Sequence, residues 1–226
     1  MIPVSDEDAV RKRLFPLINL ALIAINIIVF VYELSLPRRQ LEAFVAAFGV
    51  TPFEIVTGRD IPPPAPGPVW LTLLTAMFIH GGPLHIAGNM LYLWIFGDNV
   101  EDAMGHFRYL IFYLLCGLIA SLAQVLSDPL SRVPSVGASG AIAGVLGAYV
   151  VMFPRARVRT LLFIGPFFTI GRVPALLVIG LWAVIQLFAG IASLGVPTQQ
   201  TGGVAYFAHI GGFVAGVSLV WLFRRR

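Results

Sequence analysis

The sequence predicts an all-α protein, a polytopic membrane bundle of six transmembrane helices with both termini in the cytosol. Hydrophobic residues make up 58% of its 226 residues and charged residues only 12%, and the mean hydropathy is +0.88, far from the composition of a soluble domain. The apolar residues also gather in six runs, separated by proline-rich, glycine-rich or charged segments. We therefore expect one membrane domain over 14–223, between a polar leader at 1–13 and a basic tail at 224–226.

The first apolar run, Leu14 to Leu34, predicts a retained transmembrane helix. It is ~21 residues long, enough to cross a hydrocarbon core of ~30 Å and too long for a signal-peptide core. A long mixed loop follows from Pro37 to Val69. Loops of this length are more often functional than idle, and the segment Leu41 to Ile55 has the helical spacing of a helix in the membrane interface.

The other five predicted spans are bounded by turn-forming or charged residues. The second span is approached through Trp70 to Ile79 and is broken at 80–83, where Pro83 suits the first turn of a helix. The fourth span is short, because Pro154 ends it. In chain order the five spans are Pro83 to Phe96, Phe107 to Leu126, Ser139 to Phe153, Pro174 to Ile191 and Val204 to Phe223.

The basic residues set the expected orientation. Six spans place both termini on one side, and if that side is the cytosol, eleven of the 15 Lys and Arg residues lie inside. The four outside are Arg38, Arg39, Arg59 and Arg132. This asymmetry follows the positive-inside rule, so topology accounts for the net charge of +4 and we expect no nucleic-acid partner.

One hydroxyl group stands between glycines where a polar loop turns into the fourth span. Gly137 and Gly140 flank Ser139 without side chains, so another group can approach its oxygen and nearby backbone N–H groups can stay open. The same stretch suits close helix packing, because Gly140 and Gly144 form a Gly-x-x-x-Gly pair. Taken alone, the stretch does not decide between packing and chemistry.

Polar residues of three spans are expected at one depth, because the second, fourth and sixth spans all begin at the outer side. His85 and Asn89 share one helical face in the first turns of the second span. His209 lies ~8 Å into the sixth span, and the fourth rises only ~22 Å, which places Ser139 below the outer surface. Polar groups at such depth are costly unless they face a cavity or the bundle interior, so their convergence predicts a functional site.

The chemistry that uses these groups is acyl transfer. Ser139 would attack a carbonyl carbon and neutral His209 would take its proton. His85, Asn89 and a backbone N–H beside Ser139 would donate hydrogen bonds to the developing oxyanion. This hypothesis requires no cofactor and no metal ion.

The predicted pair is a Ser–His dyad without an acid. Glu33 ends the first span and the remaining acids of the spans lie at the cytosolic end of the second, so no carboxylate is expected at the depth of the site. Gly212 and Gly216 would let the sixth span pack against Gly140 and Gly144 of the fourth, which brings the histidine to the serine.

With these residues assembled, the sequence resembles the rhomboid family of intramembrane serine proteases. The order and spacing of the motifs are highly specific, although each motif alone is weak, and the likeness covers almost the whole of 14–223. The matching segments are Gly137-Ala138-Ser139-Gly140, Ala208-His209-Ile210-Gly211-Gly212 with Gly216, the run from Met77 to Asn89, and the run from Gly97 to Asp102.

The resemblance implies cleavage of other proteins' transmembrane segments near their outer ends, with small residues favoured before the cut. It assigns Ser139 and His209 as the dyad and His85 and Asn89 as oxyanion donors. It also implies that the fifth span and the cap from Leu194 to Gly203 move to admit substrate. The expected setting is a lipid bilayer, with a multi-pass protein in a prokaryotic inner membrane and the site towards the outer face.

The sequence departs from the family pattern at two positions. Many relatives follow the first-loop tryptophan with arginine, but Leu71 stands here, and the aromatic residue expected four positions after the nucleophile is Ala143. Support for the imidazole must then come from elsewhere, and Tyr149 and Tyr206 are both open choices. Glu101 resembles a structural glutamate and is kept out of the site.

Three other functions compete with this reading. An intramembrane metalloprotease needs His-Glu-x-x-His, whereas the chain has His-Ile-Ala-Gly-Asn over 85–89. A haem-binding electron carrier would use His85 and His209 as iron ligands, and a Soret band would reveal it. An inactive rhomboid-like binding protein normally lacks the serine or the histidine, and both are present here.

Overall fold

The computed structural model describes residues 2–6, 14–164, 167–194 and 204–225, and in them the chain is mostly helical. Four helices of this part are long and apolar enough to cross a membrane: α1 (Leu17–Ser35), α6 (His106–Ser127), α8 (Ala175–Ser193) and α9 (Tyr206–Phe223). A fifth candidate is the pair formed by Val69–Phe78 and α5 (Pro83–Met104), which is bent by 80° at the predicted break. The helix α7 (Ser139–Met152) is apolar but has only 14 residues.

The second predicted span is longer than expected, because α5 continues beyond Phe96 to Met104. The reason is Glu101, whose carboxylate accepts hydrogen bonds from the backbone N–H groups of Ile18 at 2.9 Å and Asn19 at 2.7 Å. These N–H groups belong to the first turn of α1 and have no partner within that helix. The polar end of α5 thus caps α1, so Glu101 has the structural role that the sequence predicted.

The long first loop is helical and reaches the segment that carries Ser139. It contains α2 (Arg38–Phe48) and α3 (Pro52–Thr57), and it is followed by η1 (Val69–Leu71), α4 (Thr72–Thr75) and η2 (Ala76–Phe78), which lead to the break before α5. The helix predicted from Leu41 to Ile55 is interrupted between α2 and α3. There the N–H of Val50 donates to the carbonyl of Ser135 at 2.9 Å, and the reverse bond is 2.8 Å long.

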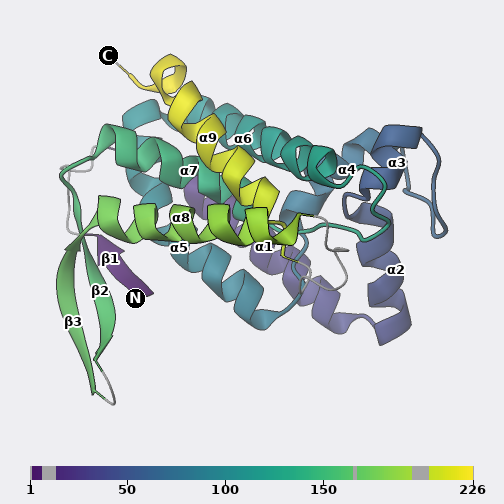
Figure 1. Ribbon diagram of the computed structural model, residues 1–226, viewed down its shortest axis with the longest axis horizontal. Helices are drawn as coiled ribbons and strands as arrows, with labels where there is room; N and C mark the ends of the chain where they lie inside the picture. The colour runs from purple at the N-terminus through teal and green to yellow at the C-terminus, as the bar shows by residue number, and fades with distance from the viewer. Residues whose placement is uncertain (1, 7–13, 165–166, 195–203, 226) are drawn as a thin grey trace.

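A three-stranded antiparallel sheet lies at the other end of the helices from α2 and α3 (Figure 1). Its strands are β1 (Ile2–Asp6), β2 (Arg157–Ile164) and β3 (Phe167–Pro174), in the order β1-β2-β3. The all-α prediction left this sheet out, and it assigned the first residues to a polar leader without predicting a strand there. The alternation Arg157, Val158, Arg159, Thr160, with arginines exposed and the other two residues buried, is the sequence signal for β2.

The helix α7 packs against α5, α6 and α9 and is buried over 140–149. Its approach to α9 requires glycine on both helices. A Cβ atom on Gly212 would overlap the carbonyl of Gly140, and one on Gly216 would overlap the carbonyl of Gly144. The predicted glycine-mediated packing of these two helices is confirmed.

Candidate active site

Ser139 is the first residue of α7, and the segment before it is held in place by backbone bonds. The bridge between Val50 and Ser135 fixes one side, and the N–H of Gly137 donates to the carbonyl of Ala76 at 2.8 Å. No side chain caps the N-terminus of α7. The first-turn N–H groups therefore stay available beside the serine, at the positive end of the helix dipole.

His209 lies directly against Ser139, with 2.7 Å between its Nε2 atom and the serine Oγ atom. Its other ring nitrogen, Nδ1, is 2.7 Å from the amide oxygen of Gln186 on α8. Because an amide oxygen can only accept, the proton of the neutral ring lies on Nδ1. Nε2 is then free to accept the serine hydroxyl proton, as a general base must.

The support of the imidazole comes from α8. The ring of Trp182 lies 5.8 Å from that of His209, centroid to centroid, at an interplanar angle of 41°. Of the two tyrosines suggested by the sequence, Tyr149 packs instead against Phe96 and Phe153, with centroids 4.9 and 5.0 Å apart.

Sequence reasoning missed Gln186 and Trp182. A signal for the first was present, because Gln186 is the one amide side chain in the apolar run of α8. A polar residue inside a membrane helix is by default a candidate for a functional contact.

His85 points its second nitrogen at the segment before the serine. The N–H of Gly81 donates to His85 Nδ1 at 3.2 Å, so the neutral ring carries its proton on Nε2. A Cβ atom on Gly137 would lie 2.8 Å from His85 Nε2, and Gly137 also has a φ of 128°. Glycine is needed there for both the backbone conformation and the approach of the imidazole. At Gly140 the space is filled by Ala120 instead, so that glycine serves packing.

Asn89 is buried beside His85 and is held by a second histidine. The amide nitrogen of Asn89 lies 3.0 Å from His80 Nε2. Because an amide nitrogen can only donate, one N–H of Asn89 is bonded to His80 and the second N–H remains available as a donor. The backbone N–H of His80 donates to the carboxylate of Glu33 at 3.2 and 3.3 Å. The expectation that no carboxylate lies at this depth is therefore wrong. Glu33 reaches the site through the break before α5, although it does not contact His209 in the described structure.

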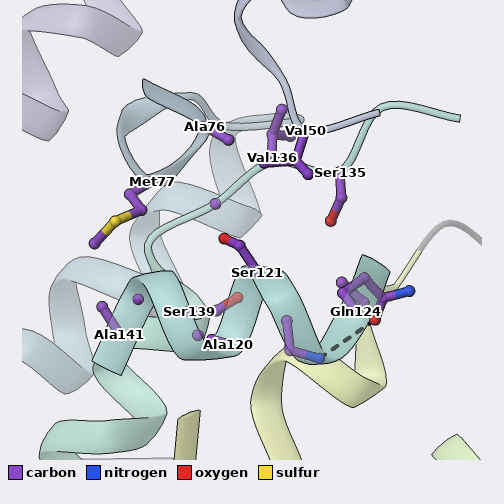
Figure 2. Close-up of a pocket in the computed structure, with 15 residues that line it drawn as sticks. Val50, Ala76, Met77, Ala120, Ser121, Gln124, Ser135, Val136, Ser139 and Ala141 are labelled. Carbon is purple, nitrogen blue, oxygen red and sulfur yellow. Dashed lines mark hydrogen bonds between the residues drawn. The ribbon is translucent and has the colours of Figure 1, made fainter. Parts of the chain in front are cut away.

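The four predicted residues open on one cavity of about 590 Å³. Ser139, His209, His85 and Asn89 all line it, together with Trp182 and other apolar side chains. On the other side of Ser139 a cavity of about 20 Å³ has room for about one water molecule. Figure 2 shows this smaller space, with Ser121 and Gln124 of α6 on one wall and Ser135 on another.

The side chains present do not suggest a metal centre. No group of three or more His, Cys, Asp or Glu side chains that could hold a metal ion occurs in the described ranges. The nitrogen of His209 that would have to ligate a haem iron opposite His85 is already bonded to Ser139. The arrangement is instead a hydroxyl, a base in the required tautomer and several N–H donors around one space.

The chain is similar to several known proteins over most of its length. The family model of the Rhomboid domain matches residues 67–226. Rhomboid-like protein 11, chloroplastic, of Arabidopsis thaliana is 34% identical over 160 residues, which cover 69% of this chain and 53% of that protein. Rhomboid protein 1, mitochondrial, of Saccharomyces cerevisiae is 31% identical over 155 residues, covering 67% and 41% respectively. Rhomboid protease GluP of Bacillus subtilis is 35% identical over 143 residues, covering 63% and 26%. The chain thus spans about half or less of the length of these relatives.

Proposed function

Because this chain belongs to the rhomboid family, we propose that it is an intramembrane serine protease that hydrolyses peptide bonds in or near transmembrane segments of other proteins. The observation that carries the proposal is the contact of 2.7 Å between Ser139 Oγ and His209 Nε2, on the wall of a cavity within a membrane bundle. A hydroxyl, a base and oxyanion donors that meet at a cavity are the parts that acyl transfer needs.

In the proposed first half-reaction, Ser139 Oγ attacks the scissile carbonyl carbon while His209 Nε2 accepts the hydroxyl proton. The negative charge moves to the carbonyl oxygen, where His85 Nε2–H, the free N–H of Asn89 and first-turn N–H groups of α7 donate to it. Collapse of the tetrahedral intermediate breaks the C–N bond, and His209 returns the proton to the leaving amine. Water then attacks the acyl-serine ester by the same route, which releases the acid and restores the hydroxyl group.

Three further residues position these groups in the proposal. Gln186 holds the proton of His209 on Nδ1, which keeps Nε2 basic. His80 holds Asn89 by one amide hydrogen, and Glu33 holds the backbone of His80. In this proposal the imidazole of His209 is held by the amide of Gln186, whereas the Glu33 carboxylate supports Asn89 indirectly, through His80.

The chain is an integral membrane protein, and we propose six spans over 14–223, counting α7 and the bent pair, with the leader 1–13, the tail 224–226 and both termini in the cytosol. The positive-inside rule supports this orientation, because eleven of the 15 basic residues fall on the cytosolic side of such a bundle. The sheet, with Arg157, Arg159 and Arg172, lies at the other end of the helices from α2 and α3 (Figure 1). The active site would then face the outer side of a prokaryotic inner membrane. The bacterial relative supports that setting, and other relatives carry the names chloroplastic and mitochondrial.

We propose further that substrate enters beside α8. The cavity is lined by Tyr92 of α5 and Trp182 of α8, so a movement of α8 away from α5 would open it to the bilayer. The cap from Leu194 to Gly203, to which the sequence assigned a share of this movement, lies beyond Leu194 outside the described residues.

The test of the function is cleavage of a single-span membrane protein with small residues near its outer end, reconstituted with the purified chain. Wild type should cut it, and His209→Ala should not, with both proteins unfolding at similar temperatures. An inactive binding protein would hold the substrate uncut, and a haem carrier would show a Soret band. Cutting by His209→Ala at the wild-type rate would refute the assigned base.

A further inference from the structure

An open cleft of about 1040 Å³ lies between the start of α6 and the end of α9. His209 stands in the first turn of α9 and Arg224 follows its last residue, so the cleft is at the end of the bundle remote from Ser139. We propose that this cleft binds the headgroup of an anionic phospholipid. The inference does not depend on whether the chain is a protease.

The polar lining of the cleft is basic. Arg108, Arg224 and Arg225 line it, and none of the described residues that form its lining is acidic, although the lining residue His106 bonds to the buried Glu101. Arg108 is exposed and makes no hydrogen bond or ion pair within the described ranges, so its guanidinium donors remain available. Arg224 lies over the ring of Trp221 at 4.2 Å, which orients its side chain. Guanidinium groups suit phosphate because their paired N–H donors match its oxygens.

One wall of the cleft is fixed by Arg225. Its Nε donates to the carbonyl of Met104 at 3.1 Å and its backbone N–H to that of Ala103 at 3.0 Å. These carbonyls end α5, and Gly105 follows them with a φ of 81°, where a Cβ atom would overlap the guanidinium of Arg225. The residues after α9 are thereby docked onto the junction of α5 and α6, which gives the cleft a defined shape.

The start of α6 adds positive potential to the same space. This helix has 22 residues, its N-cap is Gly105, and no side chain caps its first N–H groups. Helix N-termini attract phosphate through these groups and the helix dipole. The N-terminus and the two available arginines thus face one volume rather than different surfaces.

The apolar residues of the cleft select a lipid over a free phosphate ion. Phe107, Trp221 and Leu222 have 74%, 57% and 75% of their surfaces exposed, and they stand beside the arginines. A phosphate ion would leave these side chains uncovered. A phospholipid would place its phosphate on the arginines and its acyl chains along the apolar residues, as expected where a basic cleft between helices meets the bilayer surface.

The experiment is native mass spectrometry of the whole chain in detergent with equal amounts of phosphatidylglycerol and phosphatidylcholine. The wild type should retain phosphatidylglycerol at least about tenfold better. The double variant Arg108→Gln/Arg224→Gln should lose that preference. The matched control, Arg155→Gln/Arg157→Gln, removes two exposed arginines outside the cleft and should keep it. If the double variant fails to fold, Arg108→Gln alone should reduce the preference, because this side chain is exposed and unbonded in the described structure.

Three results would overturn the proposal. Equal retention of both lipids by the wild type would mean that the cleft does not select anionic headgroups. Equal loss in the control variant would assign the preference to overall charge rather than to the cleft. Complete displacement of the lipid by millimolar inorganic phosphate would identify a phosphate-ion site, because the acyl contacts would then contribute nothing. The proposal expects phosphate to leave the lipid bound.

Discussion

Two polar clusters of this bundle, a buried one around Glu101 and a half-buried one around Ser139, differ in how their hydrogen bonds are used. Glu101 has 0% of its surface exposed, and its oxygens accept from the start of α1 and from His106. Asn19, in the same cluster, donates to the carbonyl of Leu93 at 3.0 Å and accepts from Tyr109 at 2.8 Å. Each of these contacts joins two parts of the protein, so the cluster is closed.

The cluster around Ser139 is ordered but open. Three of its side chains each hydrogen-bond to the protein through one polar atom and turn another towards the serine or the cavity of about 590 Å³; they are His209, His85 and Asn89. Polar groups that stabilise a membrane bundle need partners within it, whereas groups that react need a vacant side. Histidine alone does not distinguish the clusters, since both contain it. The clusters are distinguished by the cavity beside Ser139, towards which polar atoms of its cluster are turned.

The largest effect that the comparison predicts is on Ser139→Ala. Cleavage should fall by about 10⁴-fold or more, because the attacking atom is gone. The unfolding temperature should change little, since the hydroxyl group bonds only to His209 among the described residues. Rates of substrate cleavage and thermal unfolding in detergent measure both effects. A variant that cleaves within tenfold of wild type would contradict the account.

A smaller loss is expected for Asn89→Ala. Removing one oxyanion donor should lower kcat by about 10²–10³-fold. The matched control is Asn26→Ala, which deletes a buried asparagine of α1 that bonds to the carbonyl of Leu22 and lines neither cavity beside Ser139. Steady-state kinetics should show the control with wild-type kcat. If the two variants lost the same fraction of kcat, Asn89 would be a structural residue like Asn26.

Gln186→Leu should lower kcat by about fivefold, because one neutral hydrogen bond contributes about 1 kcal/mol. The change leaves His209 Nδ1 without an acceptor, so the ring loses its preference for the reactive tautomer. Gln186→Glu restores an acceptor at that atom and should recover most of the rate. A loss in Gln186→Leu that Gln186→Glu did not repair would mean that Gln186 acts through packing.

The smallest effect on turnover is expected for Glu101→Ala, although its effect on stability is large. The free energy of unfolding should fall by about 3 kcal/mol, because several buried donors lose their acceptor. Turnover per folded molecule should stay at the wild-type value. Exposed Glu42, which pairs with Arg38 at 2.9 Å, provides the control: Glu42→Ala should change stability by less than about 1 kcal/mol. Reduced turnover by folded Glu101→Ala would erase the distinction between the clusters.

The sequence predicted contacts that depend on depth along a helix and on glycine spacing. Ser139 and His209 lie near the starts of helices that begin on the same side, so the rise per residue was enough to place them at one depth. Gly212 and Gly216 have the same four-residue spacing as Gly140 and Gly144, which predicted the close packing of the two helices. The rotation of a helix about its axis follows from packing rather than from depth.

Gln186 was missed although its amide stands out in an otherwise apolar α8, because the sequence does not show that this face of the helix turns towards His209. Glu33 was misjudged because its partner is a backbone N–H in the break before α5. The residue types in such a break do not determine where its backbone N–H groups point. The sheet was missed because β1 pairs with β2 from far along the chain, where local periodicity gives no information on pairing.

The most direct test of the central claim is covalent labelling by a serine-directed fluorophosphonate, followed by intact-mass measurement and peptide mapping. The account predicts one adduct on Ser139 of the wild type, none on Ser139→Ala, and strongly slowed labelling of His209→Ala, because the hydroxyl needs its base. An adduct on another serine, or equal labelling of wild type and His209→Ala, would show that Ser139 and His209 are neighbours without being a nucleophile and its base.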